Sequence, residues 1–281
     1  MPAAFLTEVR AALGAGGVAT DPARTAGHGI DWTGRFRAAP PVVLRPRSVD
    51  EVAAVVRAAG AHGVALVPQG GNTGLVGGAT PLDGEVVVDL CRLDTVRDVD
   101  PLGGQLTAGA GCTIAAVQAA ARGAGWAYGV DWAARDSATV GGSVATDAGG
   151  LRFVRHGSTR RQLLGVEAVL GSGEVIRHLP RVEKDNTGYD LAGLLCGSEG
   201  TLGIVTAARL RLVPPPLAAA TALVGFGSVE GAVEAAWALR RSVPALEAVE
   251  LMTEGGMALV RGVRSWSAPI GAADAVLLIE V

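Results

Sequence analysis

The sequence predicts an α+β protein with more than one domain, and three observations lead to this. Short apolar, β-prone runs such as Val42–Leu44 and Val86–Leu90 flank a helical pattern over Val49–His62. The run Pro214–Pro216 can neither continue a strand nor begin a helix, so it marks a linker. At 281 residues, 49% of them hydrophobic, the chain can form two cores.

Each element before the linker has a local signal. A helix is expected over Ala3–Leu13. Ser48, followed three residues later by Glu51, forms a capping box for the helix that Gly63 ends. Thr113 can cap another amphipathic helix that reaches Arg122. Further strands are expected at Val64–Val67, Leu106–Ala110, Leu163–Leu170, Glu174–Arg177 and Leu202–Val213.

Beyond the linker the pattern indicates the start of a second α+β domain. Strands are expected at Val224–Phe226, Leu246–Leu251 and Ala275–Val281, with a helix over Val229–Arg241. The apolar run Ala275–Val281 is interpreted as an open edge strand, which is an aggregation liability.

Composition excludes several classes of function. The net charge is −3 and no run of Lys or Arg exceeds two residues, so no nucleic-acid partner is expected. No apolar run approaches the roughly 18 residues of a membrane-spanning helix, and residues 1–20 lack the pattern of a signal peptide. Three scattered cysteines indicate free thiols in the cytoplasm. The four histidines lack metal-ligand spacing, so no metal site is expected.

Two glycine-rich segments, Pro68–Gly78 and Ser137–Gly150, are the most informative feature of the chain. Each follows an apolar stretch and contains glycines, hydroxyls and amides but no Lys or Arg. Glycine lets backbone approach a ligand closely, and consecutive exposed N–H groups form nests that bind anions. Two such nests predict a long ligand that carries a pyrophosphate, which indicates a dinucleotide.

Two common nucleotide motifs do not fit these segments. A P-loop requires a Lys after its glycines, and neither segment has one. A Rossmann fingerprint requires Gly-x-Gly-x-x-Gly at the start of a helix. The stretch Leu75–Leu82 contains Gly77, Gly78 and Pro81, so no helix is expected there.

The order of five motifs resembles the vanillyl-alcohol-oxidase and p-cresol-methylhydroxylase (PCMH) type of FAD-binding flavoenzymes. It is most similar to the branch that contains the glycolate oxidase D-subunit, D-lactate dehydrogenase and D-2-hydroxyglutarate dehydrogenase. The motifs are Arg45–Ser48, Pro68–Gly78, Ser137–Gly150, Lys184–Asp190 and Gly197–Ile204. The resemblance implies a lead-in at 1–37, a PCMH-type FAD-binding domain of two subdomains at 38–216, and an incomplete α+β cap domain at 217–281.

The resemblance also implies FAD contacts residue by residue. Those on the first segment are Pro68, Gln69, Gly70, Gly71, Asn72, Thr73, Gly74 and Leu75, around the pyrophosphate. Those on the second are Ser137, Thr139, Gly141, Gly142, Thr146, Gly149 and Gly150, and those on a later strand are Gly200, Gly203, Ile204 and Val205. The first segment lacks the histidine that covalent members often use, so the FAD is expected to be non-covalent.

Substrate contacts are less specified. Arg35 and Lys184 are candidate partners of a substrate carboxylate, and Asn186 and Tyr189 belong to a stretch that lies near the flavin in the family. For Asn186 and Tyr189 an ordinary turn remains an equal alternative. Three of the four histidines, His28, His62 and His178, are expected to face solvent or lie in loops. No catalytic residue is assigned.

The chain departs from the usual sequence motifs of the family at four positions. Ser143 and Asp147 stand where Asn is usual, His156 stands for Tyr, and Arg161 stands for Asp. A carboxylate at Asp147 would repel a pyrophosphate unless it is protonated or paired. Arg160 or Arg161 is the expected partner.

The chain is also shorter than that branch, so it is interpreted as a truncated or split member. Complete members oxidise a D-2-hydroxy acid by hydride transfer to flavin N5 and pass electrons to an acceptor. Their histidine-rich motif is absent here, so little turnover by the isolated chain is expected. The alternative is a catalytically incomplete flavin-binding remnant or a split subunit that needs a partner chain. A cell-wall precursor reductase of the same fold fits less well, because the sequence of the Asn186–Asp190 motif argues against it.

Overall fold

The computed structural model describes residues 1–263 and 269–281, and these form two compact units. Unit 1 comprises Met1–Tyr128, Ala133–Ala148 and Thr159–Pro214. Unit 2 comprises Gly129–Trp132, Gly149–Ser158 and Pro215–Val281. The chain therefore enters unit 2 twice before it reaches the proline linker. None of the described helices is long and apolar enough to cross a membrane.

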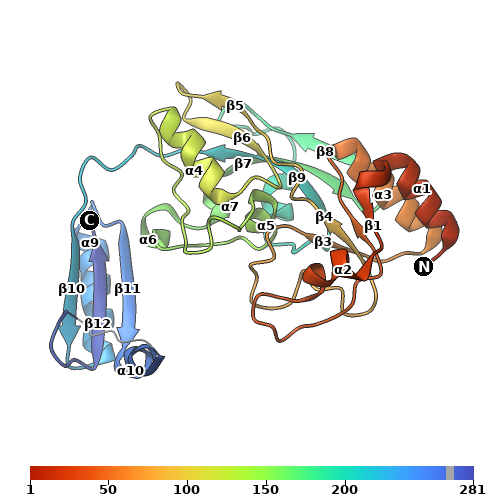
Figure 1. Cartoon of the computed structure of the whole chain (residues 1–281). Coiled ribbons are helices and arrows are strands. Elements are labelled where there is room, and N and C mark those ends of the chain that lie inside the picture. The colour runs from red at the N-terminus through yellow and green to blue at the C-terminus, as the bar shows by residue number, and fades with distance from the viewer. Residues whose placement is uncertain (264–268) are drawn as a thin grey trace. The chain divides into compact units, whose positions relative to one another are not determined.

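The first sheet of unit 1 has four short strands in the order β1-β2-β4-β3 (Figure 1). Their bounds are Val18–Ala19, Val43–Leu44, Val86–Asp89 and Leu66–Gln69. The last three are parallel and β1 is antiparallel to β2. The helices and 3-10 turns of this half are α1 (Ala3–Leu13), η1 (Ala15–Gly17), α2 (Pro22–Thr25), η2 (Ala26–Gly29) and α3 (Val49–His62).

Helix α3 has the expected caps, with one difference. The Ser48 hydroxyl accepts a hydrogen bond from the Glu51 N–H at 3.2 Å, and Gly63 ends the helix in the left-handed conformation with φ of 63°. The Glu51 carboxylate, however, accepts from the N–H of Arg47 at 2.6 Å rather than from Ser48. The capping box is therefore extended by one residue toward the N-terminus.

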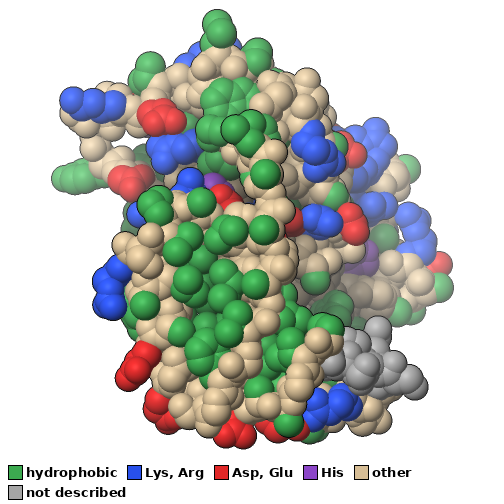
Figure 2. Space-filling view, turned by 90° about the vertical axis from the view of Figure 1, so that its left-hand side faces the viewer, with side chains coloured by type: hydrophobic (Ala, Val, Ile, Leu, Met, Phe, Trp, Pro, Cys, Tyr) green, Lys and Arg blue, Asp and Glu red, His purple; other side chains and the backbone are tan. Residues whose placement is uncertain are grey.

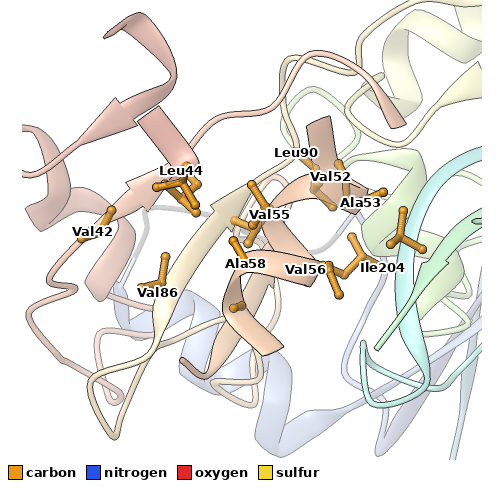
Figure 3. Close-up of a cluster of buried hydrophobic side chains, with 14 of the residues drawn as sticks. Val42, Leu44, Val52, Ala53, Val55, Val56, Ala58, Val86, Leu90 and Ile204 are labelled. Atoms are coloured by element: carbon orange, nitrogen blue, oxygen red, sulfur yellow. The ribbon is translucent and has the colours of Figure 1, made fainter. Parts of the chain in front are cut away.

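Helix α3 also supplies the main core of unit 1. Val52, Val55 and Val56 pack among apolar side chains of the first sheet, such as Leu44, and of the second sheet, such as Ile204 (Figure 3). Phe5 and Val9 of α1 are fully buried in the same cluster. The helix thus joins the two sheets through one apolar core. Burial of apolar surface in such a core stabilises the fold by about 25 cal/mol for each Å².

The second sheet of unit 1 is antiparallel, with five strands in the order β5-β6-β9-β7-β8. Their bounds are Val96–Asp100, Gln105–Gly109, Gly203–Arg211, Leu163–Leu170 and Val175–His178. The remaining helices are α4 (Ile114–Gly123), α5 (Val140–Ala145), α7 (Thr159–Gln162) and α8 (Leu191–Leu195). A parallel Rossmann sheet is excluded, and the predicted α+β class is confirmed. The sequence did not predict α5, α7, α8 or β5.

Unit 2 contains a three-stranded antiparallel sheet in the order β10-β12-β11. These strands span Thr221–Phe226, Ala275–Glu280 and Ala248–Thr253, and the helices are α6 (Phe153–His156), α9 (Val229–Ser242) and α10 (Glu254–Val263). The prediction of an open edge strand at Ala275–Val281 is wrong, because β12 is paired on both sides. Its residues Ala275, Val276 and Leu277 are at most 2% exposed.

The exposed apolar surface of unit 2 lies elsewhere. A groove of about 200 Å³ runs between α9 and the sheet, and its lining includes Val233, Trp237 and Leu251. Trp237 is 53% exposed, with the Arg240 guanidinium 5.2 Å from its ring centroid. Figure 2 shows hydrophobic side chains gathered on one face of this unit. Any tendency to associate would arise from such exposed apolar surface rather than from a strand edge.

The position of β12 generates the first prediction. Leu277→Ala should lower the free energy of unfolding of unit 2 by about 2–5 kcal/mol, because the Leu277 side chain is fully buried beside Ala232 and Ala275. Leu251→Ala, its register partner on β11, is the control and should cost clearly less, because Leu251 is 42% exposed. Hydrogen exchange of the amides in β10, β11 and β12 measures both. Equal effects would contradict the central placement of β12.

Candidate functional site

The first glycine segment leaves the carboxyl end of β3 as an irregular loop, Gly70–Ala79. Asn72 and Gly77 adopt left-handed backbone, with φ of 50° and 75°. Within residues 1–263 and 269–281, no backbone N–H from Gly70 to Ala79 donates a hydrogen bond to the protein. Consecutive donors without acceptors form a nest for an anion. This loop, which we call the first glycine loop, therefore has the donors that a pyrophosphate requires.

The two glycine-rich segments contact each other directly. A Cβ on Gly70 would lie 2.2 Å from the Thr139 hydroxyl oxygen, and a Cβ on Gly71 would lie 1.8 Å from the Ser137 carbonyl oxygen. Neither glycine has positive φ. Glycine is thus required at these positions because two backbone segments touch. Gly74 differs, because a Cβ there would meet no heavy atom of the described residues within 4 Å.

The second segment does not form the second nest that the sequence predicted. It folds into helix α5, and the Thr139 hydroxyl caps the N–H of Gly142. The N–H of Gly141 donates to Ala110 O at 2.8 Å, and that of Thr146 donates to Gly142 O at 3.0 Å. Gly149 and Gly150 belong to unit 2, where a Cβ on Gly150 would lie 1.9 Å from Asp131 O. The segment therefore acts mainly as a wall against the first glycine loop.

A third motif meets the first two inside unit 1. The turn at Glu199 and Gly200 has φ of 50° and 80°. The Glu199 N–H donates to Ala145 O at 2.8 Å, at the end of α5. A Cβ on Gly200 would lie 2.8 Å from the Pro68 ring. Motifs that are far apart in the sequence therefore converge at the end of β3.

The strand residues of this motif have another role. Ile204 and Val205 are 6% and 5% exposed on β9, and the Ile204 side chain packs in the core with α3. Gly203 lies close to β7, since a Cβ there would be 2.8 Å from Val169 O. The side chains at 204 and 205 are therefore parts of the protein core, and only their backbone remains for a ligand.

The expected partner of Asp147 is present. Arg160 donates to the Asp147 carboxylate from its backbone N–H at 2.9 Å and from Nε at 3.2 Å. Its other guanidinium nitrogens donate to the carbonyl oxygens of Gly193 and Cys196. Burial, followed by the nearby Asp147 charge, raises the pKa of the Cys196 thiol to about 12. The thiol therefore stays neutral, and Arg160 offsets the Asp147 charge.

His156, another departure, lies in unit 2. Its Nε2 is 3.3 Å from the Glu247 carboxylate, which Arg155 also approaches at 3.5 Å. Burial lowers the pKa of His156 below its usual value, although Glu247 acts in the opposite direction. Arg152 of the same segment pairs with Glu280 at 2.8 Å. These ion pairs hold the segment Gly149–Ser158 within unit 2.

The four candidate substrate residues are all exposed side chains of unit 1. Lys184, Asn186 and Tyr189 lie in an exposed stretch, and Tyr189 is 92% exposed. That stretch is tied down by the His178–Asp185 contact at 2.7 Å. Arg35 is exposed on the lead-in loop. Within the described part of the chain these four side chains form no hydrogen bond or ion pair, so they are free to bind a ligand.

Sequence reasoning missed His28. It was expected to face solvent or lie in an ordinary loop, but its Nδ1 lies 2.6 Å from the Gln69 amide oxygen, at the start of the first glycine loop. Gln69 was assigned to the cofactor, yet its side chain is 3% exposed and bound to the protein. No local sequence signal reveals a contact across 41 residues.

Fold and site together define a flavin-binding protein of α+β architecture, and comparisons support this. Residues 40–178 match the family model of the FAD binding domain. A solved alkyldihydroxyacetonephosphate synthase superposes with a TM-score of 0.81 at 21% identity, covering 100% of this chain and 56% of that one. That likeness shows the fold.

Two curated relatives are more similar in sequence. D-2-hydroxyglutarate dehydrogenase of Xanthomonas citri pv. viticola is 44% identical over 235 residues, which is 84% of this chain and 50% of that protein. The mitochondrial D-2-hydroxyglutarate dehydrogenase of Bos taurus is 38% identical over 268 residues, 94% and 49% respectively. The chain thus spans about half the length of these relatives. It belongs to the PCMH-type family of FAD-binding proteins, and the predicted cofactor, FAD, is confirmed.

The contact between the two glycine segments generates a second prediction. Gly71→Val should destabilise unit 1 by about 3 kcal/mol or more, because its Cβ overlaps the Ser137 carbonyl oxygen. Gly74→Val should leave the apoprotein Tm nearly unchanged but weaken FAD binding at least ~10-fold if the loop backbone closes on the phosphates. Thermal unfolding of apoprotein and flavin titration separate the effects. Unchanged FAD affinity in Gly74→Val would remove this part of the loop from the site.

A third prediction concerns Asp147 and Arg160. Asp147→Asn should cost about 0.2–1 kcal/mol of unfolding free energy, because the pair is partly exposed and Asn tolerates the φ of 48°. Arg160→Ala should cost about 1–3 kcal/mol, because it also leaves the carbonyl oxygens of Gly193 and Cys196 without their donor. Urea unfolding compares the two. Equal costs would show that the ion pair, and not the carbonyl contacts, is the main role of Arg160.

Proposed function

We propose that this chain forms part of an FAD-dependent oxidoreductase that oxidises a D-2-hydroxy acid of the glycolate, D-lactate or D-2-hydroxyglutarate type. The observation that carries the proposal is the run of backbone N–H groups from Gly70 to Ala79, inside the matched FAD binding domain, that have no acceptor among the described residues. The names of the two curated relatives support the substrate class. Nothing in the described residues contradicts this class.

The residues present fit a flavin dinucleotide. Backbone donors of Gly70–Leu75 bind the pyrophosphate, and the wall formed by Ser137, Thr139 and α5 limits the loop on one side. The turn at Gly200 packs against the ring of Pro68, just before the loop begins. Asp147 does not oppose binding, because Arg160 neutralises it. Bound FAD supplies the acceptor for the hydride that leaves the substrate carbon.

We further propose that the flavin is held without a covalent bond, because Pro68–Gly78 contains no His, Cys or Tyr. Arg35 and Lys184 are the proposed partners of the substrate carboxylate, since both are exposed cations without an ion-pair partner among the described residues. Asn186 and Tyr189 are proposed to lie beside them. A cationic group is needed there because charge-assisted hydrogen bonds orient a carboxylate. No residue is assigned as the base.

The domain limits remain part of the proposal. We divide the chain into a lead-in at 1–37, an FAD-binding domain at 38–216 and a cap domain that begins at 217. The break between Pro214 and Pro215 supports this division. The proposed partners are a small 2-hydroxy acid and an electron acceptor. Three free cysteines support a cytoplasmic location, which cell fractionation tests.

The alternative is a flavin-binding protein without turnover of its own, which requires a partner chain. The chain covers about half of each relative. Both readings predict yellow protein whose flavin is released by acid precipitation. They differ in whether substrate reduces the flavin.

Anaerobic mixing separates them. FAD-loaded protein is mixed with D-2-hydroxyglutarate, D-lactate or glycolate, with the L-enantiomers of the first two as controls, and the loss of flavin absorbance is followed. Stereospecific bleaching is the result expected for the oxidoreductase. Bound flavin that none of the acids bleaches would support the partner-dependent alternative, and protein that binds no flavin would refute both. Loss of the general base alone lowers rates about 10²- to 10⁴-fold, so slow bleaching must be followed for hours.

A further inference from the structure

Residues 28–36 lie before the matched FAD binding domain, yet they touch the first glycine loop at three places. The His28 ring lies 2.6 Å from the Gln69 amide oxygen. The Asn72 amide donates to Ile30 O at 2.8 Å. Gly77 packs on the Phe36 ring so closely that a Cβ would lie 2.5 Å from it. These contacts follow the loop from its start to its end.

Gln69 closes the loop. Its amide nitrogen donates to His28 O at 3.0 Å and to Ala79 O at 2.9 Å. Gln69, which directly precedes the loop, is thereby bonded to Ala79, which ends it. Because the nitrogen is engaged with two carbonyls, the amide oxygen must accept from His28. His28 Nδ1 therefore carries the proton.

Residues 28–36 are themselves held in one shape. The buried Asp31 carboxylate accepts from the Thr33 hydroxyl at 2.5 Å and from the Phe36 N–H at 3.0 Å. Burial acts to raise the pKa of Asp31, but these hydrogen bonds outweigh it and lower the pKa below its usual value. The Ala38 N–H donates to Gly29 O at 2.8 Å and closes the base of the turn. The segment is therefore a preformed surface rather than a loose leader.

None of these contacts uses a backbone N–H of the first glycine loop. They engage side chains, carbonyl oxygens and ring faces, so the loop is fixed from one side while its donors stay available. A loop that is already ordered loses less conformational entropy when a ligand binds.

We propose that residues 28–36 form a clasp that preorganises the first glycine loop for the phosphates of its cofactor, with His28 and Asn72 as positioning residues. The clasp extends the binding site beyond the matched domain, to a segment that the sequence assigned to a lead-in. It rests on the proposed binding of FAD by that loop.

Two variants remove one contact each without straining the backbone. Asn72→Gly removes the bond to Ile30, and glycine adopts the φ of 50° more readily than Asn. His28→Ala removes the bond to Gln69, and His28→Asn restores a donor near the position of Nδ1. His62→Ala is the matched control, because His62 contacts Glu8 at 3.1 Å and none of the clasp.

Three measurements are made on each variant: the Kd for FAD by flavin-fluorescence titration of apoprotein, the apoprotein Tm, and hydrogen exchange of peptides that cover 28–36 and 69–79. Asn72→Gly and His28→Ala should raise Kd about 10-fold and speed exchange in these two peptides only. Their Tm should change no more than that of His62→Ala. His28→Asn should recover most of the affinity.

The outcomes separate this inference from the proposed function. Wild-type protein that binds no FAD would overturn both. Wild-type binding with unchanged Kd in Asn72→Gly and His28→Ala would overturn the clasp alone. A loss of affinity that matches a general loss of Tm, and that His28→Asn does not recover, would show that the contacts only stabilise the fold and would also overturn the clasp.

Discussion

The close approach of two backbone segments, at Gly70–Gly71 and Ser137–Thr139, is the constraint on which the site depends. There is no room for a side chain between them, since a Cβ on Gly71 would overlap the Ser137 carbonyl oxygen. The contact brings the end of β3 in the first sheet against the start of α5, which packs on β9 of the second sheet. The turn at Glu199 and Gly200 joins the same place through Ala145 and Pro68.

The apolar core around α3 holds the two sheets, and therefore this contact between the glycine segments, in a fixed position. Helix α3 packs on both sheets through the same apolar face, so the sheets cannot slide independently. Arg57 on this helix also donates to Gly173 O at 3.0 Å, in the β7–β8 hairpin. Tightly packed interiors transmit such restraints because they contain few voids. The rigid frame leaves the first glycine loop as the part whose donors remain open.

The departures at Asp147 and His156 show how local charge is handled. Asp147 would oppose a phosphate ligand if it were alone, but Arg160 pairs with it and also binds two carbonyl oxygens of the segment around α8. His156 faces Glu247 in unit 2. In both places, a residue that differs from the usual family motif has a charged side chain beside it. The Asp147–Arg160 pair is partly exposed, where such pairs contribute little to stability, so its main effect is on local charge and orientation.

The sequence by itself determined most of the strands, the helices α1, α3, α4 and α9, the α+β class, the two glycine segments and the FAD-binding family. These features depend on local periodicity, capping residues such as Ser48 and Thr113, and motifs that are contiguous in the chain. Sequence reasoning failed where partners are distant. It placed β12 at an edge, interpreted α5 as a second nest, and treated His28 as an ordinary solvent-facing or loop residue. The tertiary structure decided these cases, because strand order, the acceptors of buried N–H groups and contacts across 41 residues are set by chain packing.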